Sequence, residues 1–219
     1  LVAKQKAAGW AFLIPASAMI AIMSFFPMVK AFILSLQTGK GANMHLSGFS
    51  NYVRMFQDKV FLKSIFNTFY YAVATVPLLM ALALFLAVML NSKIPLRGFI
   101  RSAVYAPAVV STVVVGTVFT WIFQDQLGLI NYLLTSVGAK AIQWNNDPKF
   151  AMLMLVTATM WQKAGYNMVI YLAGLQSIPT ELMEAATIDG ASTFQKFRYI
   201  TLPLLKNTHM FVMITCMIN

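Results

Sequence analysis

Long stretches without a charged side chain constrain this chain more than any other feature. Residues 7–29, 69–90 and 102–123 contain no Asp, Glu, Lys or Arg. A helix of about 20 apolar residues matches the thickness of a bilayer's hydrocarbon core. Because lipid offers no partner to backbone N–H and C=O groups, such runs must form helices. The sequence therefore predicts an all-α integral membrane protein.

The same argument gives the positions of the spans. We expect spanning helices at about 8–32, 66–90, 102–123, 150–175 and 208–219, as one polytopic helical bundle over residues 1–219. The run at 208–219 is too short to cross a bilayer, so we expect a single transmembrane domain that is truncated at its carboxyl end. Valines make 109–118 strand-like by propensity, but the length of the surrounding run favours a helix.

Positive charge is spread along the chain. There are 16 Lys and Arg residues against 6 Asp and Glu, a net charge of +10. These cations flank the apolar runs, which suits anionic lipid and argues against a nucleic-acid partner. The short loop 91–101 holds three cations and no anion, which predicts the cytoplasmic side. We therefore expect a multi-pass protein of the plasma or inner membrane, with a cytoplasmic amino terminus and cytoplasmic loops 91–101 and 176–208.

One cation falls in the middle of a predicted span. Lys163 lies beside Trp161 and Gln162 in the middle of 150–175. A charge at that depth is costly and usually faces a cavity or a partner. We predict that Trp161, Gln162 and Lys163 line a pathway. Two alternatives stay open: the Lys163 side chain reaches the interface, or the helix is shifted by one turn.

Small residues recur at four-residue spacing in two of the spans. They are Ala83 and Ala87 in one, and Thr112, Gly116 and Thr120 in the other. Small side chains at this spacing allow helix backbones to approach closely. We expect both sets to be helix-packing faces, and a face that lines a substrate path is the alternative.

The segment 177–205, which we call the elbow, is polar and lies between apolar runs. A first helix is expected to begin near Pro179 and to end at Asp189-Gly190, because glycine readily adopts the left-handed conformation that closes a helix. Ser192 and Gln195 predict a capping box that starts a second helix, which Pro203 would close. A linker on the membrane surface is the simpler alternative.

Particular side chains give the elbow a surface suited to a partner. Leu182, Ala185, Ala186 and Asp189 fall on one narrow face of the first helix, at i, i+3, i+4 and i+7. Phe194 and Phe197 are expected to share a face of the second helix and to anchor a partner. A plain linker needs neither feature.

The elbow resembles the EAA signature of permease subunits of binding-protein-dependent ABC importers. The residues that carry this resemblance are Glu184-Ala185-Ala186, Asp189-Gly190-Ala191, Phe197, Ile200 and Leu202-Pro203. Further segments are similar to the carbohydrate-uptake branch, the maltose and glycerol-phosphate type. They are Gly48-Phe49-Ser50-Asn51-Tyr52, Asn67-Thr68, the run 106–121, Gly128-Leu129-Ile130-Asn131 and the run 172–179.

This resemblance implies a fold and a set of partners. The fold would be that of a type I ABC importer permease, with six spanning helices of which about five are present here. The partners would be a second permease subunit, two ATP-binding cassette subunits and an extracytoplasmic solute-binding protein. The elbow would couple to the ATPase through Glu184, Ala185, Ala186, Asp189, Gly190, Ala191, Phe194, Phe197, Leu202 and Pro203.

The expected function is therefore ATP-driven uptake of a sugar or sugar-like solute. The chain has no G-x-x-x-x-G-K-[ST] loop, so ATP hydrolysis is expected on a separate subunit and the chain is not predicted to be an enzyme. We expect no cofactor and no metal site, since no group of candidate ligands stands out. The alternatives are a permease for a non-sugar solute and a membrane scaffold without transport activity.

Overall fold

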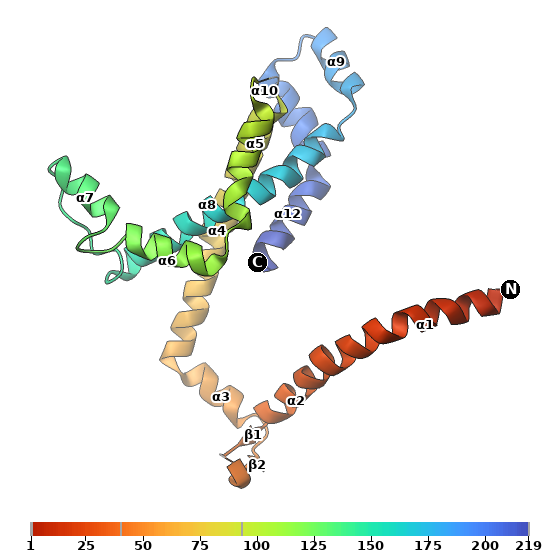
Figure 1. The fold of residues 1–219 in the computed structure, drawn as a ribbon, viewed down its shortest axis with the longest axis vertical. Helices are drawn as coiled ribbons and strands as arrows, with labels where there is room; N and C mark the ends of the chain where they lie inside the picture. Colours follow the sequence, from red (N-terminus) through yellow and green to blue (C-terminus); the bar gives the residue numbers. More distant parts are fainter. Residues whose placement is uncertain (1, 40, 93, 219) are drawn as a thin grey trace. The chain divides into compact units, whose positions relative to one another are not determined.

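The computed structural model describes residues 2–39, 41–92 and 94–218, most of them in helices (Figure 1). It divides into two compact units, Leu1–Asn67 and Thr68–Asn219. Helix α4 (Lys59–Asn91) contributes its beginning to the first unit and the rest to the second.

The first unit opens with one continuous helical run that contains the predicted span 8–32. It consists of α1 (Val2–Ile20), the π-helical segment η1 (Ala21–Phe25) and α2 (Phe26–Ser35). Proline clashes with the carbonyl four residues before it, and the wider π turn just before Pro27 removes that conflict. The part from Trp10 to Ser35 is apolar enough to cross a membrane and is not buried against other described residues.

A small hairpin and a short helix complete this unit. Their bounds are β1 (Gln37–Thr38), η2 (Gly41–Asn43), β2 (His45–Leu46), which pairs antiparallel with β1, and α3 (Ser50–Gln57). The Asn51 amide donates to the carbonyl oxygens of Ser35, at 2.9 Å, and Gln37, at 2.7 Å. Asn51 therefore ties α3 to the end of α2, which gives the 48–52 motif a structural role.

The second unit contains the remaining elements. They are α5 (Arg97–Tyr105), η3 (Ala106–Val109), α6 (Thr112–Ile122), α7 (Leu129–Ser136), α8 (Pro148–Gln176), α9 (Thr180–Ile188), α10 (Thr193–Lys196), η4 (Phe197–Thr201), α11 (Leu202–Leu204) and α12 (Lys206–Ile218). Asp147 caps α8 by accepting from the Lys149 N–H at 2.9 Å, with Pro148 in the first turn.

The core of the second unit lies between α4, α8 and α12. Ala83 and Ala87 of α4 are fully buried, as are Met168 and Tyr171 of α8 and Val212 of α12. The Tyr171 hydroxyl and His209 Nδ1 share a 2.9 Å hydrogen bond that joins α8 to α12. The packing face predicted at Ala83 and Ala87 is therefore confirmed.

Close approach of α8 to α5 depends on a residue without a side chain. A Cβ added at Gly165 would collide with the Val104 carbonyl oxygen and the Tyr105 backbone. A side chain at this position would push the helices apart. By contrast, Thr112, Gly116 and Thr120 are exposed in the described chain, so the second predicted packing face is not used within it.

The predicted single helix 102–123 is wrong in its continuity. The structure breaks it between η3 and α6, and the two parts enclose an angle of 95°. Val110 and Ser111 are extended, with ψ of 136° and 135°. Pro107 and the β-branched residues around the break make a straight helix less favourable, and α8 holds the bend through Gln162.

By length and composition, the described residues contain two helices that could cross a membrane, Trp10–Ser35 and Lys59–Asn91, and the bent pair would be a third. Helix α8 covers the predicted span 150–175 with 29 residues but is more polar, because Gln162, Lys163 and Asn167 lie in its middle. Helix α12 covers most of 208–219 and has 13 residues.

Pro203 does not end the second helix of the elbow, contrary to the prediction. The π-helical segment η4 precedes it, just as η1 precedes Pro27. The wider turn lets the chain pass the proline without losing helical geometry. The helical path is interrupted only at Leu205, one residue before α12 begins.

Candidate functional site

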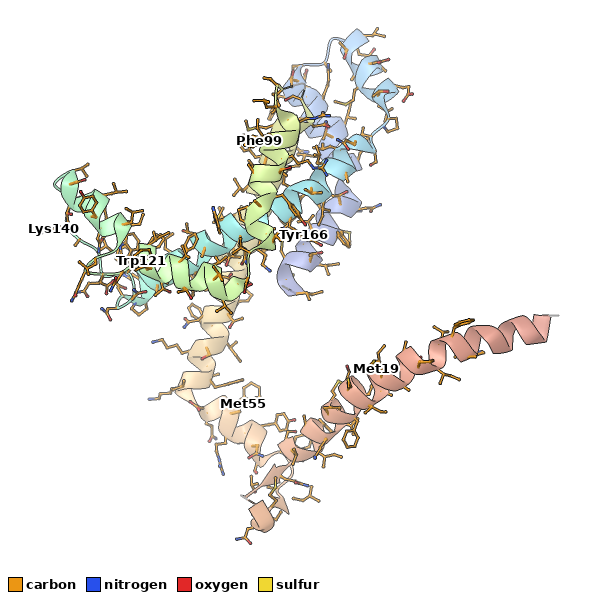
Figure 2. The ribbon with its side chains drawn as sticks, viewed as in Figure 1. Met19, Met55, Phe99, Trp121, Lys140 and Tyr166 are labelled. Atoms are coloured by element: carbon orange, nitrogen blue, oxygen red, sulfur yellow. The ribbon has the colours of Figure 1, made fainter. Side chains whose placement is uncertain are left out.

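A pocket of about 540 Å³ lies within the second unit. One face of α4 between residues 68 and 79 lines it, together with residues 108 and 110–112 at the bend before α6. Central turns of α8 and the final turn of α12 complete the lining. Figure 2 shows Tyr166 projecting from the middle of α8, where that helix lines the pocket. Polar lining residues include Tyr71, Thr75, Thr159, Gln162, Lys163, Tyr166 and Asn167.

Gln162 connects the pocket to the bend between η3 and α6. Its amide nitrogen donates to the Val110 carbonyl oxygen at 3.0 Å and to the Thr112 hydroxyl at 3.3 Å. The helix break leaves the Val110 carbonyl without its helical partner, and Gln162 supplies one. Gln162 is therefore a pocket residue that also fixes the wall of the pocket.

Two buried polar atoms at the pocket have no hydrogen-bond partner among the described residues. They are the Thr75 hydroxyl and the Asn167 Oδ1 atom, on side chains that are only 4% and 2% exposed. Leaving such atoms unpaired costs about 1–3 kcal/mol each. Both residues line the pocket, so the two unpaired atoms belong to its wall.

The three predicted pathway residues divide in the structure. Gln162 and Lys163 line the pocket. Trp161 is not among its described lining residues. Its ring packs on Phe119, with centroids 5.6 Å apart, and it is half exposed.

Sequence reasoning missed the pocket residues of α4 and several of α8. Tyr71 and Thr75 lie one turn apart on α4, and the Tyr71 hydroxyl meets the Thr159 hydroxyl at 2.7 Å across 88 residues of sequence. Thr159, Lys163 and Tyr166 follow a spacing of i, i+4 and i+7, which marks one face of a helix. The spacing of these polar residues could have predicted the pocket-facing side of α8. The contact of that side with α4 could not be predicted from the sequence.

The elbow forms the predicted helix–glycine–helix arrangement. Gly190 has a φ of 78° after the end of α9, and the Ala191 N–H donates to the Ala186 carbonyl at 2.9 Å. This bond closes the helix in the way expected of a left-handed glycine. The predicted capping box is confirmed: the Gln195 N–H donates to the Ser192 hydroxyl, and the Ser192 N–H to the Gln195 side chain.

A side-chain contact holds the two helices of the elbow together. The Lys196 ammonium donates to the Thr187 hydroxyl at 2.8 Å. Ile188 and Phe194 project outward with 87% and 73% of their surface exposed. The elbow therefore exposes apolar side chains on two helices that a hydrogen bond holds together.

The signature residues of the elbow differ in exposure. Glu184, Ala185, Asp189, Gly190 and Pro203 are exposed, Ala191, Phe197 and Leu202 are half-buried, and Ala186 is buried. The small-residue face predicted on α9 is thus accessible except at Ala186. Phe194 is more exposed than Phe197, so the two rings do not form one uniform surface.

Comparison with known proteins gives consistent matches. Residues 80–219 match the family described as "Binding-protein-dependent transport system inner membrane component". The chain is 37% identical to the lactose transport system permease protein LacF of Rhizobium radiobacter, over 96% of this chain and 72% of that protein. It is 36% identical to the arabinooligosaccharides transport system permease protein AraP of Bacillus subtilis, over 95% and 67%.

A solved structure agrees with these relatives. The crystal structure of a bacterial alginate ABC transporter, in complex with alginate pentasaccharide-bound periplasmic protein, contains a chain that superposes with a TM-score of 0.84. That chain is 25% identical, and the match covers 97% of this chain and 72% of the other. The helical fold, the elbow and these matches together show that the chain belongs to the inner membrane components of binding-protein-dependent transport systems, the permease subunits of ABC importers.

Proposed function

We propose that the chain forms part of the translocation path for a sugar or sugar-like solute, and that the solute passes through the pocket between α4, α8 and α12. The observation that carries this proposal is the pair of buried, unpartnered polar atoms on Thr75 and Asn167. Saccharides present many hydroxyl groups, which both donate and accept hydrogen bonds. The relatives named for lactose and arabinooligosaccharides support the same solute class.

Lys163 and Gln162 belong to this proposed path. Trp161 would lie at the edge of the path, where its ring packs on Phe119. The membrane interior explains why these polar groups converge. Ionisable and amide side chains in spanning helices are costly unless they face a partner or water. A path for a polar solute supplies both.

The elbow is proposed to couple the path to an ATP-binding cassette subunit. In Figure 1, α9 and α10 lie at one end of the second unit and α6 and α7 at the other, with α8 running between them. A helix of 29 residues is roughly 43 Å long, enough to reach from one face of a bilayer to the other. This arrangement is compatible with an elbow at one membrane face, and the cations of loop 91–101 favour the cytoplasmic face. A cytoplasmic amino terminus is proposed from the positive-inside rule alone.

The full assembly would contain a second permease subunit, two ATPase subunits and the solute-binding protein on which the family depends. Glu184, Ala185, Ala186, Asp189, Gly190 and Ala191 would form the docking surface, together with Phe194, Phe197, Leu202 and Pro203, of which Phe194 projects outward from the fold. The exposed, small side chains of α9 would allow close contact with a groove in the ATPase.

Replacing Thr75 with valine tests the path. The Thr75 hydroxyl bonds to no described residue, so its removal should leave the fold unchanged or more stable. If the hydroxyl binds solute during transport, uptake should fall roughly tenfold, which corresponds to ~1.4 kcal/mol. The measurement is uptake of radiolabelled sugar by cells or proteoliposomes that contain the full complex.

Thr117→Val is the matched control. Its hydroxyl bonds to the Val113 carbonyl in its own helix at 2.9 Å, and it lies outside the pocket. Uptake by this variant should match the wild type. Wild-type uptake by Thr75→Val, at equal amounts of assembled complex, would contradict a path through the pocket.

A further inference from the structure

The pocket carries a positive charge without a balancing negative one. Lys163 is the basic residue among its described lining residues, and none of these is acidic. Across the described chain, no carboxylate forms an ion pair with the Lys163 ammonium within 4.0 Å. The cation is thus half-buried among α4, α8 and α12 with no protein counter-ion there.

An uncompensated ammonium in a membrane interior is unfavourable. An ammonium group that leaves bulk water stays charged only where an opposite charge or strong hydrogen-bond acceptors replace the lost water. A neutral saccharide can offer hydroxyl oxygens to Lys163 but leaves its charge uncompensated. An anionic saccharide offers both acceptors and the missing charge.

The groups around Lys163 suit the rest of such a solute. The Thr75 hydroxyl and Asn167 Oδ1 lack partners among the described residues, and the hydroxyls of Tyr71 and Thr159 meet each other in the lining of the same pocket. These groups would bind sugar hydroxyls, while Lys163 would bind the charged substituent. One pocket therefore holds the two chemistries that an acidic sugar presents.

We propose that the pocket takes an anionic saccharide, one that carries a carboxylate, sulfonate or phosphate group, and that Lys163 is its counter-cation. This inference rests on the proposed path through the pocket. It goes further by assigning a charge to the solute and a specificity-determining role to Lys163.

A cysteine in the pocket allows the electrostatic potential there to be measured by chemical labelling. Cys216 is the single cysteine of the chain, and it lines the same pocket as Lys163. Charged methanethiosulfonate reagents that enter the pocket can react with Cys216. Their rates measure the local potential, because a positive site concentrates anions and repels cations.

The experiment uses the assembled complex in proteoliposomes and follows the Cys216 peptide by mass spectrometry. It compares an anionic sulfonatoethyl reagent with a cationic trimethylammonium reagent, each corrected for its rate with a free thiol. We expect the anionic reagent to react about tenfold faster, and Lys163→Met to reduce the ratio to about 1. Lys163→Arg should keep the preference, and Lys206→Met, which removes an exposed cation outside the pocket, should leave it unchanged.

A second arm tests the solute itself. Glucuronate should protect Cys216 from labelling more than glucose at the same concentration, and Lys163→Met should abolish the difference. Equal protection by the two sugars would overturn the proposal.

The outcomes separate this inference from the proposed function. If both reagents label Cys216 equally and Lys163→Met changes nothing, the pocket is an open path but the anionic solute is wrong, as expected if a carboxylate from a second permease neutralises Lys163. If neither reagent labels Cys216 in the assembled complex while both label it after denaturation, the pocket is not a path and the proposed function itself fails.

Discussion

Replacing Gly190 with valine is expected to abolish ATP-coupled uptake while the protein still inserts into the membrane. Gly190 has a φ of 78°, in the left-handed region that β-branched residues resist. A Cβ at this position would meet no other atom within 4 Å, so the cost is conformational and not a clash. Relieving a strain of roughly 1–2 kcal/mol requires α9 to change direction relative to α10.

The measurement is uptake together with the amount of permease in the membrane. Gly190→Asn is the matched control, because asparagine tolerates the left-handed conformation, and it should keep most of the uptake. Gly138→Val, at a loop glycine with a φ of 80° and equally open surroundings, calibrates how far such strain alone lowers the membrane level. Normal uptake by Gly190→Val would refute the elbow as the coupling device.

Reversing the charge of Glu184 or Asp189 is expected to release the ATPase subunit from the complex. Both side chains are exposed, and neither forms an ion pair within the described chain, so a lysine there should leave the elbow folded. If the ATPase binds here, the new lysine faces a surface of the ATPase that is complementary to a carboxylate. Such mismatches typically cost several kcal/mol.

Co-purification measures this release. The yield of ATPase per permease should fall at least about tenfold for each variant, which corresponds to ~1.4 kcal/mol or more. Glu181→Lys changes an exposed acid one turn earlier, outside the signature, and should retain the ATPase. Wild-type stoichiometry in the Glu184 and Asp189 variants would argue that the ATPase docks elsewhere.

Local sequence rules predicted the parts of this fold that local physics controls. Uncharged apolar runs predicted the helices α1, α2 and α4, and a largely apolar run that contains Lys163 predicted α8, because lipid leaves the backbone no alternative. The bend at Gly190 and the capping box at Ser192 were also predicted, since both depend on bonds between residues a few positions apart. The family resemblance of the elbow rests on the same short segment.

Features that depend on distant contacts were not predictable in the same way. The 95° break in 102–123 is held by Gln162, which lies 52 residues beyond the Val110 carbonyl it binds. The sequence predicted a helix end at Pro203, but the structure has a π-helical turn before it. A proline is compatible with either outcome, and its presence alone does not distinguish a helix end from a widened turn.

The pocket shows the same limit. Lys163 and Gln162 are recognisable in the sequence as polar residues within a span. Thr75 is a candidate only because α4 and α8 line the same pocket in the fold. Its significance lies in a missing hydrogen bond, which no sequence pattern encodes. Trp161, adjacent to Gln162 in sequence, points instead toward Phe119 because successive helical residues face different directions.

Cross-linking from the tip of the elbow tests the central claim most directly. Ile188 is 87% exposed at the end of α9, and Val137 is 79% exposed after α7, at the other end of the second unit (Figure 1). In a Cys216→Ser background, Ile188→Cys should cross-link to the ATPase subunit and resist reagents that cannot cross the membrane. Val137→Cys should react with those reagents and capture no ATPase. An Ile188→Cys variant that never captures the ATPase, or that reacts only from outside the cell, would contradict the account.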